Sequence, residues 1–129
     1  MTKIWHTKKI YLSTPFFAGL PGFENYHTIQ ITYNFQNGTQ TARHPHPGRP
    51  YYAIGFPRTS FLPDTDRGRL VLALLERAFN TGHTFRVDPA GGDVVWAGIP
   101  HRTEFAEPHL TQEWLEGVLD YLQRLGIQP

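Results

Sequence analysis

The residues best suited to bind a ligand lie close together between positions 96 and 104. His101 and Arg102 carry N–H groups that can donate to phosphate oxygens, and Thr103 adds a hydroxyl. Trp96 offers an apolar face for an adenine or a ribose, and Glu104 ends the group. This set suits a nucleoside diphosphate. The alternative is that Trp96 fills the core while Arg102 and Glu104 form an ion pair on the surface.

A second group of titratable residues follows along the chain. Glu107 and His109 lie two positions apart, and a carboxylate beside an imidazole can perform general acid–base work. Asp120 adds a further carboxylate close to the C-terminus. The alternative for Glu107 and His109 is a solvated surface loop. The three residues are therefore kept as catalytic candidates, and no catalytic residue is assigned.

A histidine pair, His44 and His46, resembles two metal ligands. The sequence supplies no third ligand nearby and surrounds the pair with prolines, so we expect a structural loop without a metal. The chain has no cysteine, which excludes disulfides and thiolate metal sites. Four arginines close in sequence are expected to be solvated charges, with binding of an anion or of single-stranded nucleic acid as the alternative: Arg49, Arg58, Arg67 and Arg69.

The strands that must position these residues have clear patterns. Residues 28–35 alternate between apolar and polar side chains, which predicts a strand with one buried face. Asn37 and Gly38 follow, a pair typical of a type I′ hairpin turn, and the partner strand is predicted at Thr39–Thr41. A further strand is predicted at Lys9–Ser13, and Tyr51–Phe61 is expected to form short strands or a buried loop. A turn joins two more predicted strands, Thr84–Val87 and Val94–Trp96.

Two helices are predicted from apolar residues at helical spacing. The first follows Pro63, with Asp64 or Asp66 as its N-cap and Gly82 as its stop. Its buried stripe is Leu70, Val71, Leu74, Leu75, Ala78 and Phe79. The second is capped by Thr111, with Leu110 contacting Leu115, and ends at Gly126. Its buried stripe is Leu115, Val118, Leu119, Leu122 and Leu125. This order of elements predicts an α+β fold in which both helices pack on an antiparallel sheet.

Several segments, taken together and in order, resemble the C-terminal domain of the Deltex ubiquitin ligases. The resemblance covers residue 20 to the end. We therefore expect one domain over residues 1–129, in which 1–19 form an N-terminal extension containing a strand and 20–129 form the Deltex-like domain. The segments are Leu20–Gly22, Thr28–Tyr33, Asn37–Gly38, His44–Tyr51, Gly55–Arg58, Phe61–Asp64, Gly68–Leu75, Val94–Trp96 and Ile99–Glu104.

The resemblance implies a function as well as a fold. In Deltex ligases this domain follows a RING domain, and its pocket for ADP-ribose and NAD can present ADP-ribosylated targets, or NAD itself, to ubiquitin transfer. The ligand-binding residues expected here are Trp96, His101, Arg102, Thr103, Glu104 and His109. No cofactor beyond ADP-ribose or NAD as ligand is expected. Without cysteine, no zinc-binding RING of the usual type is expected in this chain, so a RING would come from another protein.

The chain departs from the family pattern where the family is implicated in ADP-ribose transfer. Pro100 replaces the first histidine of a His-His pair. Counting back from the last helix, His109 stands at the family's tyrosine position and Glu107 at its histidine position. Tyr121 replaces a helix carboxylate, and the neighbouring Asp120 points about 100° away around a helix. Binding is therefore the leading expectation, and activity as an ADP-ribosyltransferase or NAD-consuming enzyme acting on ubiquitin is the alternative.

Composition limits the partners. With 12 Lys and Arg against 11 Asp and Glu, the formal charge of +1 gives no general attraction to nucleic acid or to an anionic membrane. No apolar stretch matches a signal peptide or a membrane span, so we expect a soluble, cytoplasmic protein. The third class of function is an interaction module that lacks the pocket and binds a protein or single-stranded nucleic acid.

Overall fold

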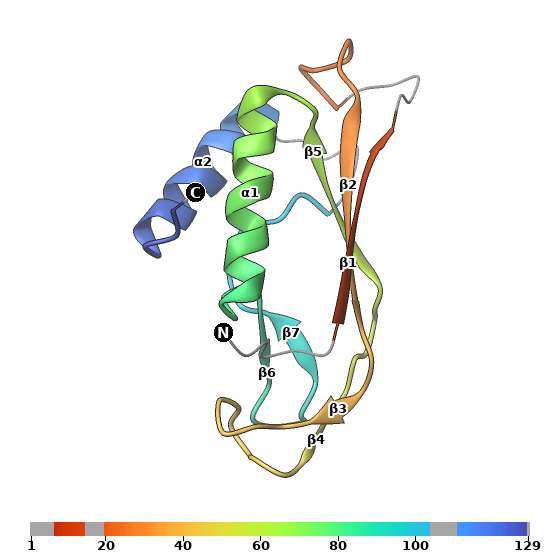
Figure 1. The fold of residues 1–129 in the computed structure, drawn as a ribbon, viewed down its shortest axis with the longest axis vertical. Helices are drawn as coiled ribbons and strands as arrows, with labels where there is room; N and C mark the ends of the chain where they lie inside the picture. Colours follow the sequence, from red (N-terminus) through yellow and green to blue (C-terminus); the bar gives the residue numbers. More distant parts are fainter. Residues whose placement is uncertain (1–6, 15–19, 104–110, 129) are drawn as a thin grey trace.

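The computed structural model describes residues 7–14, 20–103 and 111–128, with backbone alone for 7–14. These residues form a three-stranded antiparallel sheet, two short two-stranded sheets and two helices (Figure 1). In chain order the elements are β1 (Thr7–Thr14), β2 (Thr28–Phe35), β3 (Gly38–Thr39), β4 (Pro50–Tyr51), β5 (Arg58–Pro63), α1 (Asp66–Asn80), β6 (Phe85–Val87), β7 (Val94–Trp96) and α2 (Thr111–Arg124). The predicted α+β class with antiparallel sheets and two main helices is confirmed.

The strand β2 is the centre of the main sheet. It pairs antiparallel with β1 on one side, from Thr7 opposite Phe35 to Thr14 opposite Thr28, and with β5 on the other. The predicted alternation is confirmed, because Ile29, Ile31, Tyr33 and Phe35 are all buried. The strand predicted at Lys9–Ser13 is also present, as part of β1.

The hairpin predicted at Asn37 and Gly38 is wrong. Neither residue has a positive φ, and β3 pairs with β4 instead of folding back on β2. The Asn37 side-chain oxygen accepts a hydrogen bond from the Ala53 backbone N–H at 2.8 Å. Gly38 is needed because the Tyr51 ring occupies the space where a Cβ would stand. Asn37 and Gly38 therefore allow their segment to pack closely against the segment that contains Tyr51 and Ala53.

The helix α1 begins at a different cap from the one predicted. The Thr65 hydroxyl accepts from the Gly68 N–H at 3.0 Å and is the N-cap. Asp64 instead makes a two-pronged ion pair with Arg69, at 2.6 and 3.0 Å. The stop at Gly82 is confirmed, since its φ is 81° and the next N–H, of His83, bonds back to the Ala78 carbonyl at 2.8 Å.

The helix α2 confirms its buried stripe except at the last position. Leu125 is 40% exposed, whereas Ile127 is 5% exposed and belongs to the core. Gly126 explains the exchange, because its φ of 80° turns the chain and lets the Ile127 N–H bond to the Leu122 carbonyl. The predicted contact of Leu110 with Leu115 lies outside the described residues.

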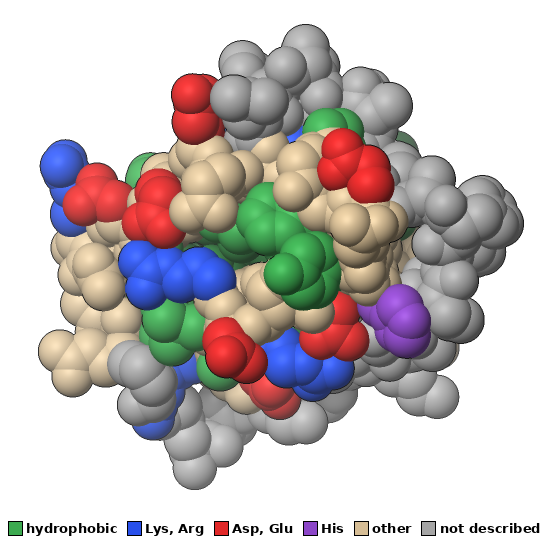
Figure 2. Space-filling view, turned by 90° about the horizontal axis from the view of Figure 1, so that it is seen from above, with side chains coloured by type: hydrophobic (Ala, Val, Ile, Leu, Met, Phe, Trp, Pro, Cys, Tyr) green, Lys and Arg blue, Asp and Glu red, His purple; other side chains and the backbone are tan. Residues whose placement is uncertain are grey.

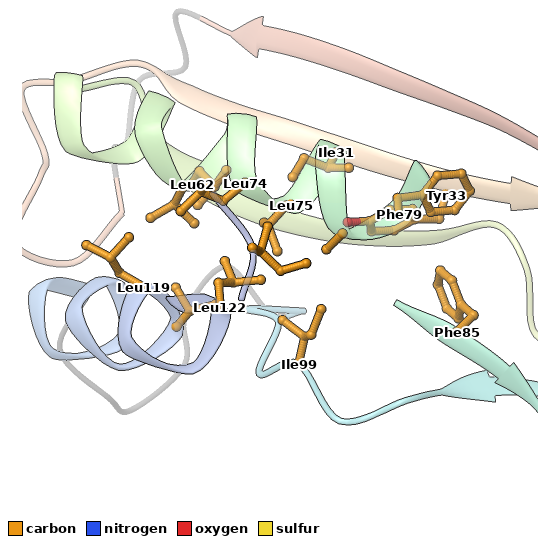
Figure 3. Close-up of a cluster of buried hydrophobic side chains, with 14 of the residues drawn as sticks. Ile31, Tyr33, Leu62, Leu74, Leu75, Phe79, Phe85, Ile99, Leu119 and Leu122 are labelled. Atoms are coloured by element: carbon orange, nitrogen blue, oxygen red, sulfur yellow. The ribbon is translucent and has the colours of Figure 1, made fainter. Parts of the chain in front are cut away.

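The core lies where α1 meets the sheet on one side and α2 on the other. Figure 1 shows α1 between α2 and the main sheet. In Figure 3, Leu119 and Leu122 of α2 point toward Leu74 of α1 and Leu62 of β5, with Ile99 beside them. Burial of this apolar surface is the main term that holds the helices in place. Among the described residues, no helix is long and apolar enough to cross a membrane.

Two helical glycines give matched tests of the packing around α1. A Cβ at Gly68 would overlap the backbone carbonyl oxygen of Pro63, whereas a Cβ at the exposed Gly117 of α2 would meet nothing within 4 Å. We therefore expect Gly68→Ala to lower the free energy of unfolding by about 1–3 kcal/mol. Gly117→Ala should raise it by up to about 1 kcal/mol, because alanine favours helix. Urea unfolding followed by circular dichroism measures both; equal effects of the two substitutions would contradict the packing described for Gly68.

Candidate functional site

Four of the predicted ligand-binding residues lie on the segment that follows β7 and contacts α2 through Trp114: Trp96, His101, Arg102 and Thr103. His109 lies outside the described residues. Trp96, at the end of β7, is half-buried and packs against the core. Its ring stacks on Phe85, with centroids 4.6 Å apart, and lies tilted against the His101 ring, with centroids 4.5 Å apart. The sequence left two roles open for Trp96, a core residue or an apolar face for a ligand. Trp96 packs on the core and is also partly exposed, so both roles fit its position.

Both ring nitrogens of His101 are engaged within the protein. Nδ1 lies 3.0 Å from the Ile99 carbonyl oxygen, and Nε2 lies 3.0 Å from the Tyr33 hydroxyl. A carbonyl oxygen can only accept, so Nδ1 carries the hydrogen. In the neutral ring Nε2 then accepts the hydroxyl hydrogen of Tyr33, a fully buried residue of β2. The imidazole is thus fixed in one tautomer by the sheet and by its own backbone.

The electrostatic state of His101 follows from its surroundings. Burial lowers the pKa of His101 to about 4, and the hydrogen bond to the Ile99 carbonyl opposes this shift only in part. The ring is therefore neutral at neutral pH. It offers a ligand an aromatic edge and a fixed dipole, without a positive charge for phosphates.

The two residues after His101 differ sharply in exposure. Arg102 is 0% exposed, so the interpretation as a surface ion pair with Glu104 is wrong for its side chain. Its backbone carbonyl accepts from the Phe61 N–H of β5 at 2.8 Å, which ties the segment to the main sheet. Thr103 is exposed, and Glu104 lies outside the described residues.

The helix α2 holds the same segment from the other side. The Trp114 indole N–H donates to the Pro100 carbonyl at 2.9 Å. Seven residues later on the same face, the Tyr121 hydroxyl lies so near Gly98 that a Cβ there would be 2.8 Å from it. Gly98 also has a φ of 127°, which favours glycine. Pro100 itself is exposed, so its ring does not fill the interior beneath the segment.

A cation lies close to the Trp96 ring. The Arg58 guanidinium stands 4.2 Å from the centroid of the Phe56 ring and 5.6 Å from that of Trp96. It donates to the carbonyls of Ile54 at 3.0 Å and Val94 at 3.3 Å. Partial burial lowers the pKa of Arg58, although arginine stays charged at any physiological pH. The sequence grouped Arg58 with surface charges; its contacts come from residues distant in the chain.

The other arginines of that sequence cluster do not form a joint surface. Arg67 pairs with Glu116 of α2 at 3.1 Å, and Arg69 pairs with Asp64. The Glu116 carboxylate raises the pKa of Arg67, and the Asp64 carboxylate raises that of Arg69. Both ion pairs lie at the surface, where they link the start of α1 to neighbouring residues. Figure 2 shows this end of the molecule, where acidic and basic side chains surround a group of hydrophobic ones.

Of the three catalytic candidates, the described part of the chain contains Asp120. The Asp120 carboxylate is 61% exposed and pairs with Arg124 at 2.9 Å, one helical turn along α2. Its neighbour Tyr121 is the residue that faces the Gly98 segment. Glu107 and His109 lie outside the described residues. Their catalytic roles stay predictions.

The histidine pair of the proline-rich loop has structural contacts. His44 Nδ1 accepts from the Thr41 N–H at 2.8 Å, and His46 Nε2 lies 3.1 Å from the Pro89 carbonyl oxygen. Burial lowers the pKa of His44. Across the residues that the structure describes, no group of three or more His, Cys, Asp or Glu side chains is placed to hold a metal ion.

Sequence comparisons with known proteins cover most of the chain. The sequence model of the Deltex C-terminal domain matches residues 11–127. The E3 ubiquitin-protein ligase DTX1 of Xenopus laevis is 40% identical over 119 residues, which is 84% of this chain, and the human DTX1 is 37% identical over the same length. Mouse E3 ubiquitin-protein ligase DTX4 is 36% identical. The chain spans 19% of the length of each of these relatives.

The pKa of His101 makes the stability of the protein depend on pH. A histidine titrates near 6.5 when unfolded and near 4 in the folded protein, so the unfolded state binds the proton first as pH falls. We therefore expect the contribution of His101 to the free energy of unfolding to be fully present above pH 6.5. Up to about 3 kcal/mol of it should be lost as the pH falls from 6.5 to 4. His44 contributes in the same direction.

The substitution His101→Gln isolates this effect, because glutamine keeps an acceptor for Tyr33 and cannot be protonated in this range. Urea midpoints measured at pH 7, 6, 5 and 4.5 should fall less steeply in His101→Gln than in the wild type. The control is His83→Gln, which changes an exposed histidine. A pH dependence unchanged by His101→Gln would show that another group is responsible.

Proposed function

The chain belongs to the Deltex C-terminal domain family, and we propose that it is a module that binds ADP-ribose or NAD at the Trp96–Thr103 segment. The observation that carries this proposal is the partly exposed Trp96 ring, which packs beside a neutral His101 on a segment that ends in the exposed residue Thr103. An aromatic face suits an adenine or ribose, and polar groups at its edge suit a pyrophosphate.

Rigidity supports the proposal. The segment is held at three points: Tyr33 on His101, the Phe61 N–H on the Arg102 carbonyl, and Trp114 on the Pro100 carbonyl. A binding surface that is already ordered loses little conformational entropy when a ligand arrives, so more of the contact energy appears as affinity.

Positive charge for the phosphates comes from arginine in this proposal. His101 is neutral, and Arg102 is enclosed beneath the segment. Arg58 is partly exposed beside the Trp96 ring. Its guanidinium would face the diphosphate, while the buried charge of Arg102 would add to the local potential.

The relatives suggest where such a module acts. They are named as E3 ubiquitin-protein ligases, and this chain matches about one fifth of their length. We propose that the chain recruits ADP-ribosylated proteins, or NAD, to ubiquitin transfer carried out by a RING domain on a separate protein. The RING and the transfer chemistry are thus assigned to the partner.

Calorimetry with ADP-ribose and with NAD tests the binding site. We expect saturable heat for the wild type and about tenfold weaker binding for Thr103→Glu, because a carboxylate near the pyrophosphate repels it by about 1.4 kcal/mol. The matched control is Ala73→Glu, which places the same charge on the exposed side of α1. No heat and no thermal shift with either ligand at millimolar concentration would overturn the proposal. If Thr103→Glu and Ala73→Glu weakened ligand binding equally, the binding site would not lie at Thr103.

A further inference from the structure

Three arginines stand apart from the others in the way their side chains are used. The chain has nine arginines, all within the described residues. Five of them bond to a carboxylate or a carbonyl, and the buried Arg102 also has an interaction: Arg58, Arg67, Arg69, Arg77 and Arg124. In the part of the chain that the structure describes, no side-chain partner holds the guanidinium of Arg43, Arg49 or Arg86.

Two of these three arginines line one groove. Arg43 and Arg86 are both exposed and border a groove of about 510 Å³. One wall is the turn Ala42–Pro45, and the other is Gly82 with Phe85–Val87 and Pro89. This volume lies within the range that small ligands and short peptide segments occupy. No acidic residue is among the described residues that line it.

The wall that carries Arg43 is rigid. The Gln40 side chain donates to the Pro50 carbonyl at 3.1 Å and accepts from the His46 N–H at 2.9 Å, which braces the loop internally. The His46 ring reaches the Pro89 carbonyl at 3.1 Å and so ties this loop to the opposite wall. A hydrogen bond thus joins the two walls of the groove, which lies at the end of the molecule opposite the start of α1 (Figure 1).

The acceptor groups near Arg43 and Arg86 already have other hydrogen-bond donors. The C-terminal carbonyls of α1 are capped by the Thr81 hydroxyl and by the N–H groups of Gly82 and His83. The Asp88 carboxylate accepts from the Ala90 N–H at 3.0 Å. His44, at the base of the groove, has its pKa lowered by burial and adds no charge at neutral pH. Two positive charges thus face one groove without an internal anion.

We propose that this groove docks an acidic side chain, a carboxylate or a phosphorylated residue, of a peptide segment from a partner protein. Two guanidinium groups can hold such an anion through paired N–H donors. The apolar parts of Ala42, Pro45 and Pro89 on either wall suit the flanking peptide. The groove shares no residue with the Trp96–Thr103 segment, so the inference stands independently of ADP-ribose binding.

Fluorescence polarisation with labelled peptide libraries tests the inference. Three libraries of seven-residue peptides carry glutamate, phosphoserine or glutamine at the central position, with the flanking positions randomised. We expect the glutamate and phosphoserine libraries to bind at least fivefold more tightly than the glutamine library at low salt. Arg43→Ala or Arg86→Ala should each remove most of this preference, and the double variant should abolish it.

Arg49→Ala is the matched control, because it removes a third arginine without a side-chain partner, from the same loop but outside the groove. It should leave the preference within about twofold of the wild type. Equal binding of all three libraries, or equal loss with Arg49→Ala, would overturn the inference. Competition by inorganic phosphate at the affinity of the best peptides would instead show a general anion site without peptide recognition. Circular dichroism confirms that each variant is folded, and calorimetry with ADP-ribose on the double variant separates failure of the groove from failure of the nucleotide site.

Discussion

The hydrogen bond between Tyr33 and His101 is the contact on which the candidate site depends. Tyr33 is 1% exposed at the centre of the main sheet, and its ring packs against Phe79, Phe85 and Trp96. A phenol hydroxyl buried among aromatic rings is costly unless it is hydrogen-bonded. His101, 68 positions along the chain, supplies the acceptor. The buried hydroxyl thus holds the histidine ring in position, while the Ile99 carbonyl, which can only accept, fixes its tautomer.

The same contact explains why the site belongs to the whole fold and not to a loop. The sheet contributes Tyr33 and the Phe61 N–H, β7 contributes Trp96, and α2 contributes Trp114. Trp96 begins the Trp96–Thr103 segment, and the other three groups reach it from β2, β5 and α2. A segment held from several sides has few alternative conformations, so its side chains keep one arrangement without a ligand. Loss of helix packing would therefore be felt at the site, although α2 need not contact a ligand.

The sequence predicted the parts of this arrangement that depend on local pattern. The alternation in Thr28–Phe35, the stop at Gly82 and the β6–β7 hairpin follow from side-chain periodicity and backbone preference, and all are present. Where it failed, a distant contact decided the outcome. Tyr51 dictates the role of Gly38, and the turn at Gly126 brings Ile127 into the core in place of Leu125. The burial of Arg102 and the neutral state of His101 have no signature within a few residues of either position.

The net charge of the protein does not show how unevenly its paired and unpaired arginines are distributed. At the end where α1 begins, Arg67 and Arg69 are neutralised by carboxylates within 3.1 Å. At the opposite end, Arg43 and Arg86 face a groove whose described lining holds no acid. Exposed ion pairs contribute little to stability. The pairing of Arg67 and Arg69 therefore does not explain why Arg43 and Arg86 have no carboxylate partner. Both arginines line one groove, so an anion inside it would lie near two positive charges. A net charge near zero is thus compatible with a local, selective attraction for an anionic group, which an even spread of the same residues would not produce.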